Sequence, residues 1–110
     1  MKVNLSRKLV LEERINTPDG KGGFTVNWNA LGVVWADVDA RYGRESLVGA
    51  RDHTRVKYRI IVRAVPIGAA ARPKVDQRFR EGTRVFSILA VAEFDAGSRY
   101  LECWSEEGKE

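Results

Sequence analysis

The strongest constraint in the sequence is an alternation of apolar and polar residues with a period of two. It is clearest in HTRVKYRIIVR, residues 53–63, where Val56, Tyr58, Ile60 and Val62 fall on one side of an extended chain. The Lys and Arg residues between them fall on the other side. This pattern predicts a β-strand with one buried face.

The same period recurs along the chain. An opening strand has Leu9, Leu11 and Ile15 on one face, and residues 24–29 alternate in the same way. In residues 33–40 both faces begin apolar, and one turns acidic towards the end. Residues 82–94 are apolar on both sides, so this strand is expected to be buried on both. A last strand covers residues 98–106. The residues expected in the core are Val26, Trp28, Val56, Tyr58, Ile60, Val62, Phe86 and Ile88.

Turn signals separate these strands. The stretches TPDGKGG (17–23), REGT (80–83) and FDAGSR (94–99) are typical of hairpin turns. Residues 41–53 are expected to form one long loop, or a short helix around 45–51. Two prolines argue against a continuous strand within residues 64–76.

The strand count and turn spacing define the fold class. About six or seven short strands with frequent turns predict an all-β fold, a small antiparallel β-barrel or sandwich. The 110 residues are expected to form a single domain, 1–110, large enough to bury a core. Apolar runs are too short for a membrane span, and the charged N-terminus does not match a signal peptide. One cysteine permits no internal disulfide, which favours a reducing, intracellular origin.

The evidence for catalytic, cofactor-binding or metal-binding residues is weak. Asp37 and Asp39 share a strand face, but a solvated strand end explains them more simply. The glycine-rich stretch links strand to strand, so it does not match a phosphate-binding loop. Cys103 with His53 could form a nucleophile–base pair, although a buried small residue is the better interpretation of Cys103. We therefore predict no enzyme, no cofactor and no metal site.

The charge is unevenly distributed. The net charge of +4 is modest, but residues 41–59 and 72–84 are rich in Arg and Lys. The C-terminal residues 102–110 are acidic. These segments could be solvated surface, a surface that faces phosphates, or two different side surfaces through which one subunit meets the next.

Several segments in order resemble the head–tail joining proteins of tailed bacteriophages, also called head-closure, stopper or head–tail adaptor proteins. The resemblance begins with RKLVLEERINT followed by TPDGKGGFTVNW. In VVWADVDARYGRE, Trp35, Ala36, Gly43 and Glu45 match the W-A…G-x-E pattern of that family. It continues through RVKYRIIVR to the closing GTRVFSILAVAEFDAGSRYLECWSEE. The alanine- and proline-rich stretch AVPIGAAARPKVDQRF departs from the family pattern.

The resemblance implies a structural connector of a phage-like particle, from a phage, a prophage or a gene transfer agent. Such a subunit forms a ring, six-fold or twelve-fold, between the portal or adaptor protein and the tail terminator or tail tube protein. The ring surrounds the channel, contacts double-stranded DNA non-specifically and closes the head after packaging. The implied location is the virion, with the bacterial cytoplasm during assembly, and no membrane is involved.

The loop of residues 41–53 is the predicted subunit-contact or channel-facing site. Its candidate residues are Arg41, Arg44, Glu45, Arg51 and His53. Arginine side chains there would bind phosphate or carboxylate groups.

An alternative function stays open. The chain could be a barrel of the oligonucleotide-binding type that binds nucleic acid non-specifically. The basic strand and the aromatic residues Trp28, Trp35 and Tyr58 support this alternative.

Overall fold

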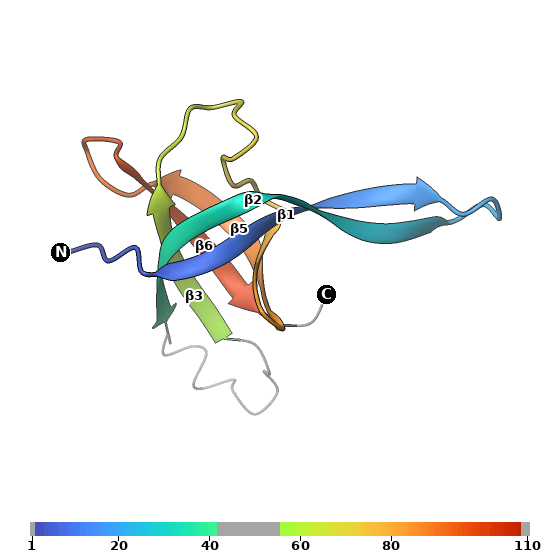
Figure 1. Cartoon of the computed structure of the whole chain (residues 1–110), viewed down its shortest axis with the longest axis horizontal. Helices are drawn as coiled ribbons and strands as arrows, with labels where there is room; N and C mark the ends of the chain where they lie inside the picture. Colours follow the sequence, from blue (N-terminus) through green and yellow to red (C-terminus); the bar gives the residue numbers. More distant parts are fainter. Residues whose placement is uncertain (1, 42–55, 109–110) are drawn as a thin grey trace.

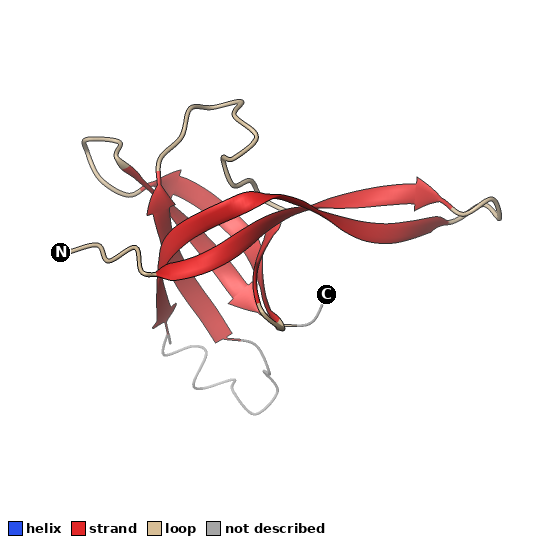
Figure 2. Ribbon diagram, viewed as in Figure 1, coloured by secondary structure: helices blue, strands red, loops and turns tan. Residues whose placement is uncertain are grey.

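The computed structural model describes residues 2–41 and 56–108, and these form six strands (Figures 1 and 2). No helix occurs within these two ranges, and so no helix there could cross a membrane. The strands are β1 (Arg7–Pro18), β2 (Phe24–Arg41), β3 (Val56–Arg63), β4 (Arg78–Glu81), β5 (Arg84–Glu93) and β6 (Tyr100–Glu107).

The strands close into one antiparallel barrel in the order β1-β2-β3-β6-β5-β4. The predicted all-β class and antiparallel barrel are confirmed. The closure is uneven, because β1 and β4 pair only at Val10↔Arg80, Leu11↔Phe79 and Glu12↔Arg78. This short β1–β4 seam is where the sheet meets itself.

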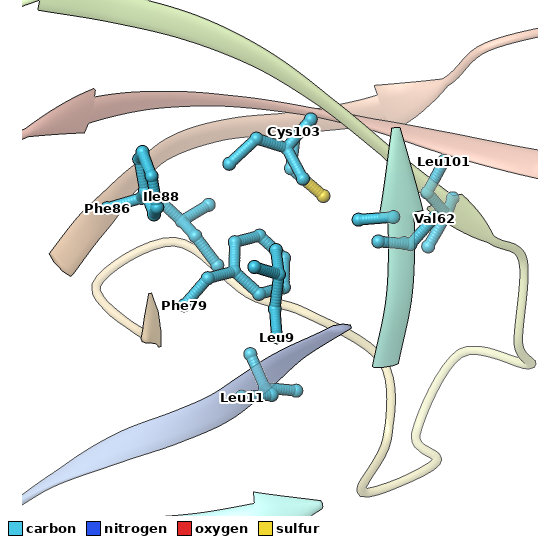
Figure 3. Packing of buried hydrophobic residues seen from close by; sticks show 10 residues of the cluster. Leu9, Leu11, Val62, Phe79, Phe86, Ile88, Leu101 and Cys103 are labelled. Atoms are coloured by element: carbon cyan, nitrogen blue, oxygen red, sulfur yellow. The ribbon is translucent and has the colours of Figure 1, made fainter. Parts of the chain in front are cut away.

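The barrel interior is a continuous apolar core (Figure 3). The phase predicted for β3 is correct, since Ile60 and Val62 are fully buried, and Phe86 and Ile88 are buried as predicted. Val56 and Tyr58 are only half-buried. The core residues are Leu9, Leu11, Ala36, Ile60, Val62, Phe79, Phe86, Ile88, Leu101 and Cys103.

Cys103 is a core residue, as predicted. It is buried between β3 and β5, and burial raises the pKa of its thiol to about 12. The side chain is therefore a neutral thiol, and it packs as a small apolar group.

Two β-bulges shift the alternation from the predicted phase. In β2 the extra residue is Leu31, because Leu11 pairs with Gly32 and Glu12 pairs with Ala30. In β5 the register shifts between Ile88 and Ala90. The prediction that residues 82–94 are buried on both sides was wrong, because Leu89 is exposed and Val91 packs on the core in place of Ala90.

The outer halves of β1 and β2 leave the barrel as a two-stranded arm, which we define as residues 13–30. β1 has 12 residues and β2 has 18, whereas β3 and β6 have 8 each. The arm projects far beyond the other strands (Figure 1). The prediction that Val26 is a core residue was therefore wrong, because it is 41% exposed, and Trp28 is only half-buried. Ile15, expected on one face with Leu9 and Leu11, is also exposed on the arm.

The predicted turns are confirmed. The arm turn has positive φ at Gly20 and Gly22, and Gly82 and Ser98 have positive φ in the other two hairpins. Residues 64–77 contain no strand, as the prolines indicated. The predicted long loop or short helix falls almost entirely on residues 42–55, outside the described residues.

Candidate assembly surfaces

The predicted contact residues lie mostly outside the described part of the chain. Arg44, Glu45, Arg51 and His53 belong to residues 42–55. Arg41 is described at the exposed end of β2, where its Nη2 lies 2.9 Å from Oδ2 of Asp39. Because Arg41 pairs with Lys57 across β2 and β3, both ends of the intervening segment meet at the same end of the barrel.

The two aspartates of β2 are engaged by protein groups. Asp37 accepts a hydrogen bond from the backbone N–H of Asn4 at 3.0 Å, and Asp39 lies between Arg41 and Arg59. Within residues 2–41 and 56–108, no three Asp, Glu, His or Cys side chains gather as a metal site would require. Their contacts give this pair a role in tying the N-terminal segment and β3 to β2.

The glycine-rich turn of the arm is closed by its own carboxylate. Asp19 Oδ1 accepts hydrogen bonds from the backbone N–H groups of Lys21, at 2.8 Å, and Gly23, at 3.1 Å. These are the groups that a phosphate cradle would offer, and a carboxylate there repels an anion. The turn is therefore a structural cap of the arm.

The described parts of the basic segment 41–59 and of the acidic segment 102–110 lie side by side. β3 and β6 are neighbouring strands, so Lys57 lies opposite Glu106 and Val56 lies opposite Glu107. Arg59 Nη1 lies 3.7 Å from Glu102 Oε2 on the same sheet. The described parts of the two segments therefore meet within one subunit.

A charged cluster holds the base of the arm at the β1–β4 seam. Buried Glu12 accepts hydrogen bonds from Nε of Arg78 at 2.7 Å and from Nε of Arg80 at 2.8 Å. The Arg78 guanidinium also lies 4.0 Å from the ring centre of Trp28. Burial acts to raise the pKa of Glu12, but the hydrogen bonds from both arginines outweigh it and lower the pKa. The ionised carboxylate therefore joins the arm to the barrel.

Two further ion pairs lie at the other end of β4, away from Glu12. Arg7 Nη2 lies 2.6 Å from Glu81 Oε1, which joins β1 to β4, and this hydrogen bond lowers the pKa of Glu81. Arg84 Nε lies 2.8 Å from Glu107 Oε2, and this hydrogen bond lowers the pKa of Glu107. The seam is thus held by two carboxylates, Glu12 and Glu81, that are more acidic than usual, and Glu107 joins β6 to β5 in the same way.

Two exposed apolar surfaces were not predicted from the sequence. The first is the face of the arm that carries Phe24 and Val26, of which Phe24 is 67% exposed. The second is an apolar recess beside β2, with a volume of about 490 Å³, where Val33 and Trp35 are each 53% exposed. The sequence pattern predicted residues 24–29 and 33–40 as separate strands, whereas the structure has one continuous β2, and the arm was missed for this reason.

The fold and these surfaces define a class of protein: a small closed β-barrel with a long projecting hairpin and exposed apolar patches suited to assembly. The model of the phage head completion protein family matches residues 2–108. The chain belongs to the phage head completion protein family. This confirms the resemblance found in the sequence.

Solved structures agree with this assignment. A chain in the virion of a native gene transfer agent particle is 45% identical, with a TM-score of 0.74; the match covers 98% of this chain and 97% of that one. Protein SF1141 from Shigella flexneri 2a, solved in solution, is 21% identical with a TM-score of 0.66, over 96% and 95% of the two chains. This second likeness shows the fold alone. None of the curated proteins matches the chain.

Proposed function

We propose that this protein is a structural connector of a phage-like particle, which forms a ring between the portal or adaptor and the tail and closes the head after DNA packaging. The observation that carries the proposal is the match over nearly the whole chain to a virion chain at 45% identity. Family membership supports the same role. The function is non-enzymatic, and the protein acts in the virion after assembly in the cell.

The barrel suits a part of this kind. Its core is formed by apolar side chains from all six strands, and ion pairs hold the seam where the sheet closes. Such a scaffold can position its loops and arm for contacts with neighbours. A ring around DNA needs surfaces that tolerate phosphates and needs no base recognition.

The structure gives little support to the alternative that the protein is a barrel of the oligonucleotide-binding type. Its three aromatic residues do not form one stacking platform: Tyr58 packs edge-on against Phe86 at 5.1 Å, and Arg78 covers Trp28. Arg59 of the basic strand is engaged by Asp39 and Glu102. Only Trp35 of the three is largely exposed.

Deletion of the gene in a producing cell tests the proposal. We expect heads and tails to accumulate as separate particles, with packaged DNA lost from the heads, and we expect the wild-type gene to restore joined particles. Complete, DNA-containing particles that lack the protein would contradict the proposed function.

The contact role of residues 41–53 stays a prediction within this proposal. Arg44 and Arg51 are expected to bind phosphates or carboxylates in the assembled particle. A double change of Arg44→Ala and Arg51→Ala should reduce DNA retention or ring formation, measured as DNA-filled joined particles per cell. Normal yields would remove this segment from the proposed contact.

A further inference from the structure

The arm has one apolar face and one polar face. Its register places Pro18 opposite Phe24, Asn16 opposite Val26 and Arg14 opposite Trp28, and directly opposed residues share a face. Pro18, Phe24, Val26 and Trp28 therefore lie together on one side, where Arg14 and Asn16 are the polar members. The other side is mostly polar and carries Thr17, Thr25, Asn27 and Asn29, with Ile15.

Only the inner end of the apolar face is covered within the subunit. Arg78 lies over Trp28, whereas Phe24 and Val26 farther out are exposed. Beyond Glu12, β1 has no described strand partner other than β2. An isolated two-stranded ribbon is marginally stable in water, so an apolar face of this kind is expected to pack on a partner.

The arm is held in a fixed direction and cannot cover its own barrel. Glu12 and Arg78 anchor its base, and its outer six residues per strand carry the tip about 20 Å from that anchor. In Figure 1 the arm points to the right, away from the N-terminal segment at the left. The partner of the arm must therefore be another molecule.

The recess beside β2 is an apolar acceptor on the barrel. β2 pairs with β3 only over residues 36–41, so its edge at Val33 and Trp35 has no described strand on the β3 side. The rest of the lining is apolar except for one charged residue, and consists of Leu5, Val34, Val62, Arg63, Val65 and Ala71. A volume of about 490 Å³ accommodates an aromatic side chain and its neighbours.

We infer that the apolar face of the arm packs into the recess of a second copy of this chain, with Phe24 and Val26 of one subunit against Val33 and Trp35 of the next. This inference rests on the proposed function and names the surfaces through which its ring forms. One chain carries both halves of the contact, on different parts of its surface, which is what a head-to-tail interface requires. Repetition of the contact by rotation closes a ring.

The charge of the arm fits an apolar contact. Residues 13–30 contain two acidic residues, Glu13 and Asp19, and two basic residues, Arg14 and Lys21, so the arm is neutral. Arm docking should therefore depend little on salt, unlike binding to DNA. One contact of this size is weak alone and gains strength when several subunits close a ring.

Disulfide trapping tests the inference directly. The variant V26C/V33C is placed in producing cells, particles are purified and oxidised, and the proteins are separated without reductant. We expect a ladder of disulfide-linked copies of the chain. The native Cys103 does not interfere, since it is buried and its thiol is not ionised. The matched control N27C/V33C, with its arm cysteine on the opposite face, should give no ladder.

The outcomes separate this inference from the proposed function. Normal incorporation of V26C/V33C without a ladder, or a V26C cross-link to a different virion protein, overturns the inference and leaves the connector function standing. Absence of the wild-type protein from particles overturns the connector function itself.

A second, independent test places a charge on the apolar face of the arm and measures incorporation of the protein into particles. Phe24→Asp should lower incorporation into particles by about tenfold, since a carboxylate would be buried in an apolar contact. Thr25→Asp, on the polar face, should leave incorporation unchanged. Both variants should show the wild-type thermal unfolding, because both side chains are exposed in the subunit. Equal incorporation of the two variants overturns the inference.

Discussion

The barrel and the arm share two strands, β1 and β2, yet the two regions use their apolar residues for different purposes. In the barrel half of β1, Leu9 and Leu11 belong to a core to which the other five strands also contribute, and both are fully buried. In the arm half of β2, Phe24 and Val26 alternate with polar residues in the same way but remain exposed. Alternation therefore predicts that a strand has an apolar face, and the surrounding strands decide whether that face serves folding or assembly.

The largest expected effect comes from making the same Phe→Ala substitution in the barrel and in the arm and comparing the two losses of stability. Phe86→Ala should lower the free energy of unfolding by about 3–5 kcal/mol, since Phe86 is fully buried and leaves a cavity. Phe24→Ala should change it by about 0.5 kcal/mol or less, because the side chain is exposed. Chemical denaturation of the purified protein measures both. Similar losses for the two variants would show that the arm is part of the folding unit.

The next effect concerns the Glu12 cluster at the β1–β4 seam, which holds the base of the arm. Glu12→Gln should destabilise the protein by about 1–3 kcal/mol, because Arg78 and Arg80 lose an ionised partner in a buried site. The adjacent Glu13→Gln is the matched control, since Glu13 makes no ion pair with any residue in the described ranges. A loss for Glu13→Gln as large as that for Glu12→Gln would contradict a specific role of the cluster.

The pH dependence of stability should follow the same cluster. The folded-state pKa values of Glu12, Glu81 and Glu107 lie below the ordinary value of 4.5. A lowered pKa stabilises the fold above the ordinary value, and this contribution is lost as pH falls through the folded-state pKa. The free energy of unfolding should therefore fall below about pH 4.5, and Glu12→Gln should make that fall shallower. An unchanged slope in Glu12→Gln would exclude Glu12 from the acid response.

The smallest effect is local to the arm. Asp19→Ala removes two hydrogen bonds to the backbone of the turn, so amide exchange near the tip should accelerate by about fivefold. The global free energy of unfolding should stay within about 0.5 kcal/mol of wild type. Lys21→Ala is the control, since the turn uses its backbone N–H and not its side chain. Exchange that accelerates equally in the barrel strands would show that arm and barrel open together.

Much of the fold could be predicted because it depends on the local pattern of apolar, polar and turn-forming residues along the sequence. The alternation around Ile60 gave the correct face of β3, and glycines with Asp19 gave the arm turn. The bulges at Leu31 and Leu89 could not be predicted, because an extra residue is defined only by the strand that it lies opposite. Each bulge reverses the faces of all the residues that follow it.

The assembly surfaces were less predictable than the family. Charge on residues 41–59 and 102–110 suggested two side surfaces, but the strand order places β3 beside β6, so the described residues Lys57 and Arg59 lie next to Glu106 and Glu102. The recess at Trp35 depends on where β3 stops pairing with β2, which no local pattern shows. Phe24 and Val26 resemble core residues in sequence, because a face that packs on a neighbouring subunit has the composition of a core.

The most direct test of the account is a cryo-electron microscopy structure of the head–tail junction in native particles. We expect a ring of this protein in which the arm of each subunit lies on the barrel of the next, with Phe24 beside Val33 and Trp35. The contrary result is a ring whose arms point into a different protein, with the β2 recess empty or filled by another chain. It would contradict the claim that apolar residues of the barrel serve folding whereas those of the arm join copies of the chain.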